Sequence, residues 1–133
     1  MSYSSTPQLS YLPTLVIDAN GAAAKQLADQ LSRSGFPADI AINRSAAEAA
    51  RLRRYYGSIV FVGDLSRPAD LQSIVELRKK SQRTWIIAIS STRPPEARNE
   101  IVRREADALL IAPFSMKDLI SRLFAFSLRS RPL

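Results

Sequence analysis

The sequence predicts an α/β domain in which a five-stranded parallel sheet lies between two layers of helices. Five short apolar runs alternate along the chain with five segments of helical length. The middle runs are nearly continuous in isoleucine, valine and phenylalanine, which is typical of parallel strands covered on both faces. A β-α order repeated five times predicts a doubly wound, three-layer sandwich with right-handed crossover connections.

The apolar runs are the expected strands, and they place one domain within residues 13–128. They comprise residues 14–18, 39–43, 58–62, 85–90 and 108–112. The last run ends abruptly at Pro113, which has no backbone N–H to give to a neighbouring strand. We expect residues 1–12 to form a flexible tail and residues 129–133 to form a tail or the stub of a linker.

The first two expected helices follow from apolar spacing and from capping residues. Residues 21–34 place four apolar side chains on one helical face, and Gly35 then ends the helix. In the next segment, Ser45 is followed three residues later by Glu48, which is the pattern of a capping box. A second helix is therefore expected to begin at Ser45.

The other three expected helices begin at proline or serine residues. Pro68 lies near the first turn of a helix that gathers cations at its end, where the helix dipole favours them. The segment 94–106 repeats the proline start. The last helix, residues 116–128, is opened by Ser115, and Asp118 completes a capping box.

Composition excludes most catalytic chemistry. The 133 residues are enough for one domain, and they include neither cysteine nor histidine. That excludes disulfides, thiol nucleophiles, zinc sites built from cysteine and histidine, and Ser-His-Asp triads. The four glycines fit neither a dinucleotide-binding fingerprint nor a P-loop. We therefore expect a domain that is not an enzyme and that has no resident cofactor.

Hydropathy and charge bear on location and partners. No apolar run approaches the ~20 residues of a membrane span, and the N-terminal residues lack the pattern of a signal peptide, so we expect a cytoplasmic domain without a membrane partner. The formal net charge of +7 raises the question of nucleic-acid binding. The basic residues are scattered, however, with glutamates among them, which favours a solvated surface.

The end of the last strand carries the clearest likeness to a known family. The segment EADALLIAPFSMKDLISRL, residues 105–123, is similar to the Lys-Pro-Phe corner and capped helix of bacterial response-regulator receiver domains. The segments WIIAISS (85–91) and TLVIDAN (14–20) resemble that family's fourth and first strands. The resemblance covers residues 13–128 and implies a CheY-like, flavodoxin-like sheet with strand order 2-1-3-4-5.

The resemblance also implies an acidic pocket at the carboxyl ends of the first and third strands. In typical members an aspartate there accepts a phosphoryl group from a histidine kinase, with Mg²⁺ held by the acidic cluster. A lysine ahead of a cis-type proline pairs with the phosphoryl group, and a threonine or serine hydroxyl follows it as a switch.

This sequence departs from the family pattern at the charged positions. Asp18 matches the first acidic position, but Ala19 stands at the second. Ala112 replaces the lysine ahead of Pro113. Losing one such preorganised charge typically costs ~10²–10³ in rate. The resemblance therefore implies a degenerate, or pseudo-, receiver, for which we expect no bound metal and in which Asp18 is a weak candidate ligand.

Several site assignments stay open at this point. The phosphoacceptor position falls on Gly63 if the third strand is aligned with the family's strand without a gap. It falls on Asp64 if the alignment is instead fixed at Pro68, four residues after Asp64. Asp64 is either a phosphoacceptor or a carboxylate of a turn. Asp18 is either a remnant metal ligand or a cap for nearby backbone N–H groups. Ser90 is either the switch hydroxyl or an ordinary serine at a strand end.

The last expected helix has more apolar residues than one buried face needs. They spread over about 200° of its surface, well beyond the ~100° that faces a sheet. This predicts an exposed apolar ridge that pairs with a partner or a second copy. The resemblance implies the same face, because receivers dimerise and signal through their fourth helix, fifth strand and fifth helix. The expected interface residues are Arg103, Lys117, Leu123, Phe124 and Phe126.

These expectations describe an atypical receiver domain that signals by protein–protein contact or dimerisation, independently of phosphorylation. Its expected partners are a protein or an attached output domain, and a second copy of the chain. The first alternative is a weak phosphorelay receiver that accepts phosphate at Asp64 and uses Mg²⁺. The second alternative is a basic domain that binds nucleic acid.

Overall fold

The computed structural model describes residues 13–129, in which strands and helices alternate strictly. The strands are β1 Thr14–Asp18, β2 Ala38–Ala41, β3 Ser58–Gly63, β4 Trp85–Ser90 and β5 Ala108–Ile111. The helices are α1 Gly21–Arg33, α2 Arg44–Arg53, α3 Pro68–Lys80, α4 Glu96–Glu105 and α5 Met116–Ser127. The tail expected at residues 1–12, and residues 130–133 of the expected C-terminal tail, lie outside the described range.

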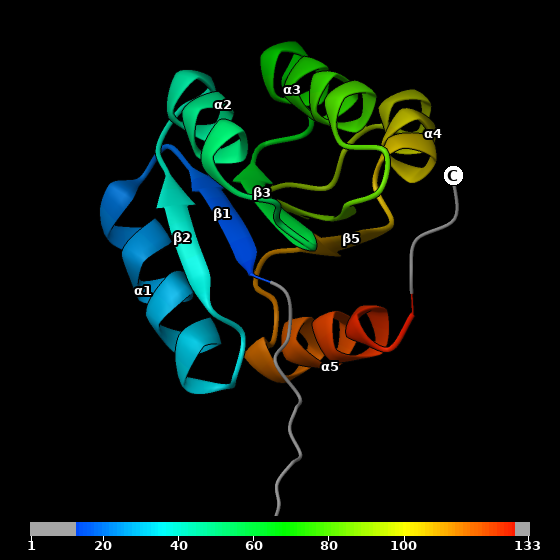
Figure 1. Cartoon of the computed structure of the whole chain (residues 1–133). Coiled ribbons are helices and arrows are strands. Elements are labelled where there is room, and N and C mark those ends of the chain that lie inside the picture. The colour runs from blue at the N-terminus through cyan, green and yellow to red at the C-terminus, as the bar shows by residue number, and fades with distance from the viewer. Residues whose placement is uncertain (1–12, 130–133) are drawn as a thin grey trace, which may run out of the picture.

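The strands form a single parallel sheet in the order β2-β1-β3-β4-β5. This confirms the predicted α/β class and the 2-1-3-4-5 order. Helices α1 and α5 cover one face of the sheet, and α2, α3 and α4 cover the other (Figure 1). Among the described helices, none is long and apolar enough to cross a membrane.

The central strands are buried on both faces, which explains their continuous apolar runs. Leu15 and Ile59 join the core beneath α2, α3 and α4, while the adjacent residues Val16 and Val60 join the core beneath α1 and α5. All four side chains are almost completely buried. Since alternate residues of a strand point to opposite faces, a polar residue at any of these positions would enter a core.

Side-chain caps fix where three of the helices begin. Asn20 accepts a hydrogen bond from the Ala23 N–H at the start of α1, and Ser115 caps α5 as predicted. The capping box predicted at Ser45 is wrong, because Asn43 caps α2 by accepting a hydrogen bond from the Ala46 N–H at 2.7 Å. Asn43 therefore belongs to the cap of α2, and β2 ends at Ala41, earlier than expected.

Two of the five expected interface residues belong to the core. Leu123 is 1% exposed and Phe126 is 8% exposed, so neither side chain is available to a partner. The Phe126 ring stacks on Trp85 with the ring centroids 4.2 Å apart and the planes within 1° of parallel. Burying such a ring stabilises a fold by ~1.5–3 kcal/mol. The apolar ridge predicted on the last helix is accordingly much narrower than expected.

A nearly buried ion pair connects helices and strands at the amino-terminal edge of the sheet. The Arg78 guanidinium donates to the Asp107 carboxylate at 2.7 Å and to three backbone carbonyl oxygens, those of Ser81, Thr84 and Glu105. The same carboxylate accepts a hydrogen bond from the Ile86 N–H. The network thereby connects the ends of α3 and α4 to the start of β4.

Candidate functional site

The carboxyl ends of β1, β3 and β4 bring most of the expected site residues to one edge of the sheet. Asp18 at the end of β1 pairs with Val62, and Gly63 at the end of β3 pairs with Ser90. The N–H of Ala112 donates to the carbonyl oxygen of Ser90 at 2.9 Å. The expected residues therefore gather where doubly wound sheets usually hold their ligands.

Asp64 is the first residue beyond β3, and its carboxylate holds its own turn. One oxygen, Oδ1, accepts hydrogen bonds from the Ser66 N–H at 3.1 Å, the Ser66 hydroxyl at 2.6 Å and the Thr92 hydroxyl at 2.6 Å. The Ser66 hydroxyl bond is the main cause that lowers the pKa of Asp64, followed by the Thr92 hydroxyl bond. This geometry matches the turn-carboxylate interpretation of Asp64.

Gly63 has no side chain because Asp70 occupies the space above it. The Oδ2 atom of Asp70, in the first turn of α3, accepts a hydrogen bond from the Asp64 N–H at 2.8 Å. A Cβ atom built on Gly63 would lie 2.8 Å from that same Oδ2. Sequence analysis noted the cations at the end of α3 but missed this role of Asp70. The signal available was an aspartate three residues into a helix that has no side-chain cap.

Ser90 directs its hydroxyl into the protein. The residue is completely buried, and its Oγ accepts a hydrogen bond from the Leu65 N–H at 2.9 Å and donates one to the Thr92 carbonyl oxygen at 2.6 Å. These two bonds join β4 to the loops that follow β3 and β4. Ser90 makes no hydrogen bond to Asp64, although Thr92 contacts both residues.

Asp18 also accepts a hydrogen bond from a residue that is close to it in the sequence. Its Oδ1 accepts a hydrogen bond from the N–H of Asn20, the residue that caps α1. This agrees with the interpretation of Asp18 as a cap for nearby backbone groups. Ala19, at the second acidic position, is exposed and adds no oxygen.

The expected site contributes two carboxylates, those of Asp18 and Asp64, to the carboxyl edge of the sheet. Mg²⁺ takes near-octahedral oxygen coordination and is usually bound by one or two carboxylates together with water molecules. Within residues 13–129, no three acidic side chains come together as metal ligands. Asp18 and Asp64 each already accept a backbone N–H through Oδ1. One oxygen of each carboxylate is thus committed to its own turn.

The corner that follows β5 keeps its proline but has no cation. The Ala112–Pro113 peptide bond is cis, and both residues are exposed. Ala112 stands at the position where the resemblance implies a lysine. What this edge offers is a carboxylate held by hydroxyl groups beside a small, uncharged corner.

Comparison with known proteins supports the fold assignment. No protein-family model and no curated protein matches the chain. Among solved structures, it is similar to a two-component response regulator from Clostridium difficile, with a TM-score of 0.75 and 18% identity over 89% of this chain and 97% of that one. A receiver domain from Francisella gives a TM-score of 0.72 and 24% identity over 89% of this chain and 98% of that one.

A third similar structure was solved with ligands in place. The response regulator TrrA from Thermotoga maritima, in complex with magnesium and beryllium fluoride, gives a TM-score of 0.71 and 20% identity, covering 86% of this chain and 98% of that one. These likenesses extend over nearly the whole length of each matched protein. Together with the strand order and the cis proline corner, they show that this chain has the receiver-domain fold of bacterial response regulators.

Proposed function

We propose that this domain is a signalling module of the two-component type that acts through protein–protein contact, without efficient phosphorylation of Asp64. The observation that carries the proposal is the state of the Asp64 carboxylate, whose Oδ1 accepts hydrogen bonds from Ser66 and Thr92. In addition, an uncharged residue, Ala112, precedes Pro113. The fold supports two-component signalling, and this site supports independence from phosphate.

The electrostatics of phosphoryl transfer support this reading. An anionic carboxylate that attacks an anionic phosphoryl group needs counter-charges, commonly a metal ion and a lysine. The Thermotoga receiver described above holds magnesium with beryllium fluoride. In this chain Ala19 and Ala112 stand at two of the charged positions. At ~10²–10³ in rate for each missing group, both losses together amount to roughly 10⁴–10⁶ if they add.

The proposed contact surface is the face formed by α4, β5 and α5. Phe124 is 45% exposed on α5, and Leu128 after the helix is also exposed. Arg103 on α4 and Lys117 on α5 are exposed and charged. An apolar centre with charged residues around it is the usual composition of a protein interface. A second copy of this chain is the partner we propose for this face.

The test of phosphate independence is intact-protein mass spectrometry after incubation with a small-molecule phosphodonor and Mg²⁺. An ordinary receiver treated in parallel shows that the conditions support labelling. We expect no added phosphate on this chain. A stable adduct of one phosphate that is absent from Asp64→Asn would contradict the proposal and place the domain in a phosphorelay.

The test of the contact surface is the molar mass in solution by light scattering. We expect a dimer for the unmodified chain and a monomer for Phe124→Asp. The matched control is Leu52→Asp, which places the same charge on an exposed apolar residue of α2, on the opposite face of the sheet. A monomeric unmodified chain, or a dimer that survives Phe124→Asp, would remove α5 from the interface.

A further inference from the structure

The amino-terminal edge of the sheet, opposite Asp64, holds two loops that are bonded to each other. One loop precedes β3 and the other precedes β4, and they lie side by side because Ser58 pairs with Trp85. The Tyr55 hydroxyl donates to the Arg83 carbonyl oxygen at 3.2 Å, and the Thr84 hydroxyl donates to the Tyr56 carbonyl oxygen at 2.9 Å. The two loops therefore form one connected surface.

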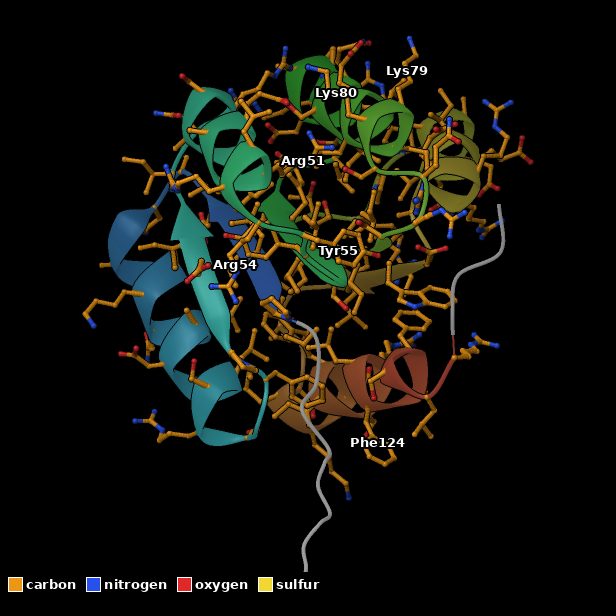
Figure 2. All side chains as sticks on the ribbon, viewed as in Figure 1. Arg51, Arg54, Tyr55, Lys79, Lys80 and Phe124 are labelled. Carbon is orange, nitrogen blue, oxygen red and sulfur yellow. The ribbon has the colours of Figure 1, made fainter. Side chains whose placement is uncertain are left out.

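A hollow of about 390 Å³ lies between these loops and the ends of α2 and α3. Its volume is within the range of small-molecule sites. No acidic side chain lines it within the described part of the chain, whereas five basic side chains do: Arg51, Arg54, Lys79, Lys80 and Arg83. Figure 2 labels four of them, which come from the end of α2, the residue after it and the end of α3, together with Tyr55. The basic hollow, as we call it, is therefore a place of concentrated positive charge.

The nearby acids only partly neutralise this charge. Glu48 is shared between Arg51 at 3.0 Å and Lys80 at 3.2 Å, so one carboxylate serves two cations. Asp39 pairs with Arg54 at 3.2 Å, and Glu76 pairs with Lys79 at 3.9 Å. Arg83 is exposed and has no acidic partner among residues 13–129. Since exposed ion pairs are weak, an incoming anion can compete for these cations.

One further feature indicates more than a phosphate ion. Tyr55 is 53% exposed, and its hydroxyl bond to the Arg83 carbonyl oxygen holds the ring at the hollow. An aromatic ring beside several cations is the arrangement on which nucleotides stack and bind.

We propose that the basic hollow binds a nucleotide, with the base against Tyr55 and the phosphate among the basic side chains that include Arg54 and Arg83. The nucleotide is either free or part of a single strand of nucleic acid, since both present the same base and phosphate. This inference does not rest on the function proposed above, because the hollow lies at the other edge of the sheet from Asp64.

Fluorescence anisotropy with the full chain tests the proposal. The probe is a labelled single-stranded oligonucleotide, and unlabelled adenosine monophosphate is the competitor. Displacement by the mononucleotide identifies a free nucleotide as sufficient, and binding of the strand alone identifies the polymer as the ligand. Failure of the chain to bind either compound would overturn the proposal.

The variants separate base stacking from charge. Tyr55→Leu is expected to weaken binding about tenfold through lost stacking. Tyr55→Phe keeps the ring but loses its hydroxyl bond to Arg83, so it is expected to weaken binding less than Tyr55→Leu does. Arg83→Ser is expected to weaken binding and to lower the slope of affinity against salt by about one. Arg93→Ser is the matched control, because it removes the same charge from an exposed residue after β4, at the Asp64 edge.

Three results would contradict the nucleotide assignment. The first is an equal loss of affinity in Arg83→Ser and Arg93→Ser, which would indicate general charge attraction. The second is unchanged binding in Tyr55→Leu. The third is displacement by polyglutamate as effective as displacement by the mononucleotide, which would make the hollow a site for acidic protein segments. A urea unfolding midpoint for each variant confirms that a loss of binding is not a loss of fold.

Discussion

The two edges of the sheet use their charged residues differently. At the carboxyl edge, Asp18 and Asp64 each accept a hydrogen bond from a residue two positions further along the chain. At the amino-terminal edge, Arg78 reaches Asp107, which is 29 positions away in sequence. The carboxyl edge thus holds its carboxylates with uncharged N–H and hydroxyl donors, including the Thr92 hydroxyl, 28 positions from Asp64. The other edge pairs a carboxylate with a guanidinium. The comparison indicates that carboxylates stabilise turns and loops at the first edge, while charge pairing joins helices and strands at the second.

The largest expected effect is the loss of the Arg78 network. Arg78→Met leaves the Asp107 carboxylate nearly buried without its cation, and it removes the donors of three carbonyl oxygens. Breaking such a pair from one side costs about 3–5 kcal/mol of unfolding free energy, measured by urea denaturation. Arg103→Met, on an exposed residue, is the control and should change it by less than about 0.5 kcal/mol. Equal effects would show that the network does not stabilise the amino-terminal edge.

Alkaline pH should also weaken the amino-terminal edge. Burial, and then the hydrogen bond to Asp39, raises the pKa of Tyr56 to about 12. The folded state thus favours the neutral phenol, so this stabilisation is complete below about pH 10 and is lost as the pH rises through 12. With ~1.4 kcal/mol per pKa unit, the loss amounts to roughly 2–3 kcal/mol.

Unfolding free energies measured between pH 9 and about pH 12 test this expectation. Tyr56→Phe should remove most of the alkaline loss, while Tyr55→Phe should leave it in place. If Tyr56→Phe follows the same pH curve as the unmodified chain, another group causes the loss.

At the carboxyl edge, the contact between Gly63 and Asp70 can be tested by adding one carbon atom. Gly63→Ala places a Cβ about 2.8 Å from the Asp70 Oδ2, so the carboxylate must move away from the Asp64 N–H. We expect a loss of about 1–2 kcal/mol in unfolding free energy. The same substitution should cost less in an Asp70→Ala background, as a double-mutant cycle measures. Additive losses would show that the two positions do not interact.

The smallest expected effect is acid sensitivity at Asp64. Its pKa is lowered mainly by the Ser66 hydroxyl, so the folded state favours the charged carboxylate. The stabilisation is therefore present above the unfolded-state pKa and is lost as the pH falls through the lower, folded-state pKa. Asp64→Asn should flatten the acid end of the stability curve. Ser66→Ala should raise the pKa of Asp64, as NMR titration of the carboxyl carbon would show.

The fold could be predicted from sequence because its signals are local and repeated. Continuous apolar runs, proline starts and Gly35 mark the strands and helices, and the order of the strands followed from the resemblance at residues 105–123. The Ser45 error arose because Asn43 and Ser45 are both good capping residues. Only the backbone geometry decides which of them adopts the extended conformation of a cap.

The site was harder to predict because its contacts depend on pairs distant in sequence. The role of Phe126 is set by stacking on Trp85, 41 positions away, which helical periodicity cannot reveal on a helix that is apolar over most of its surface. The bond from the Thr92 hydroxyl to Asp64 likewise joins two loops. The residue types indicated which side chains were charged, but not which of them already had hydrogen-bond partners within the protein.

The stacking of Trp85 on Phe126 also gives the protein an intrinsic fluorescence probe of its fold. Trp85 is the chain's single tryptophan, and its indole stacks on the Phe126 ring. The Arg129 guanidinium lies 5.0 Å from the indole centroid and 5.9 Å from the Phe126 centroid. Emission from this indole depends on the contact between α5 and the start of β4. A red shift therefore reports detachment of α5.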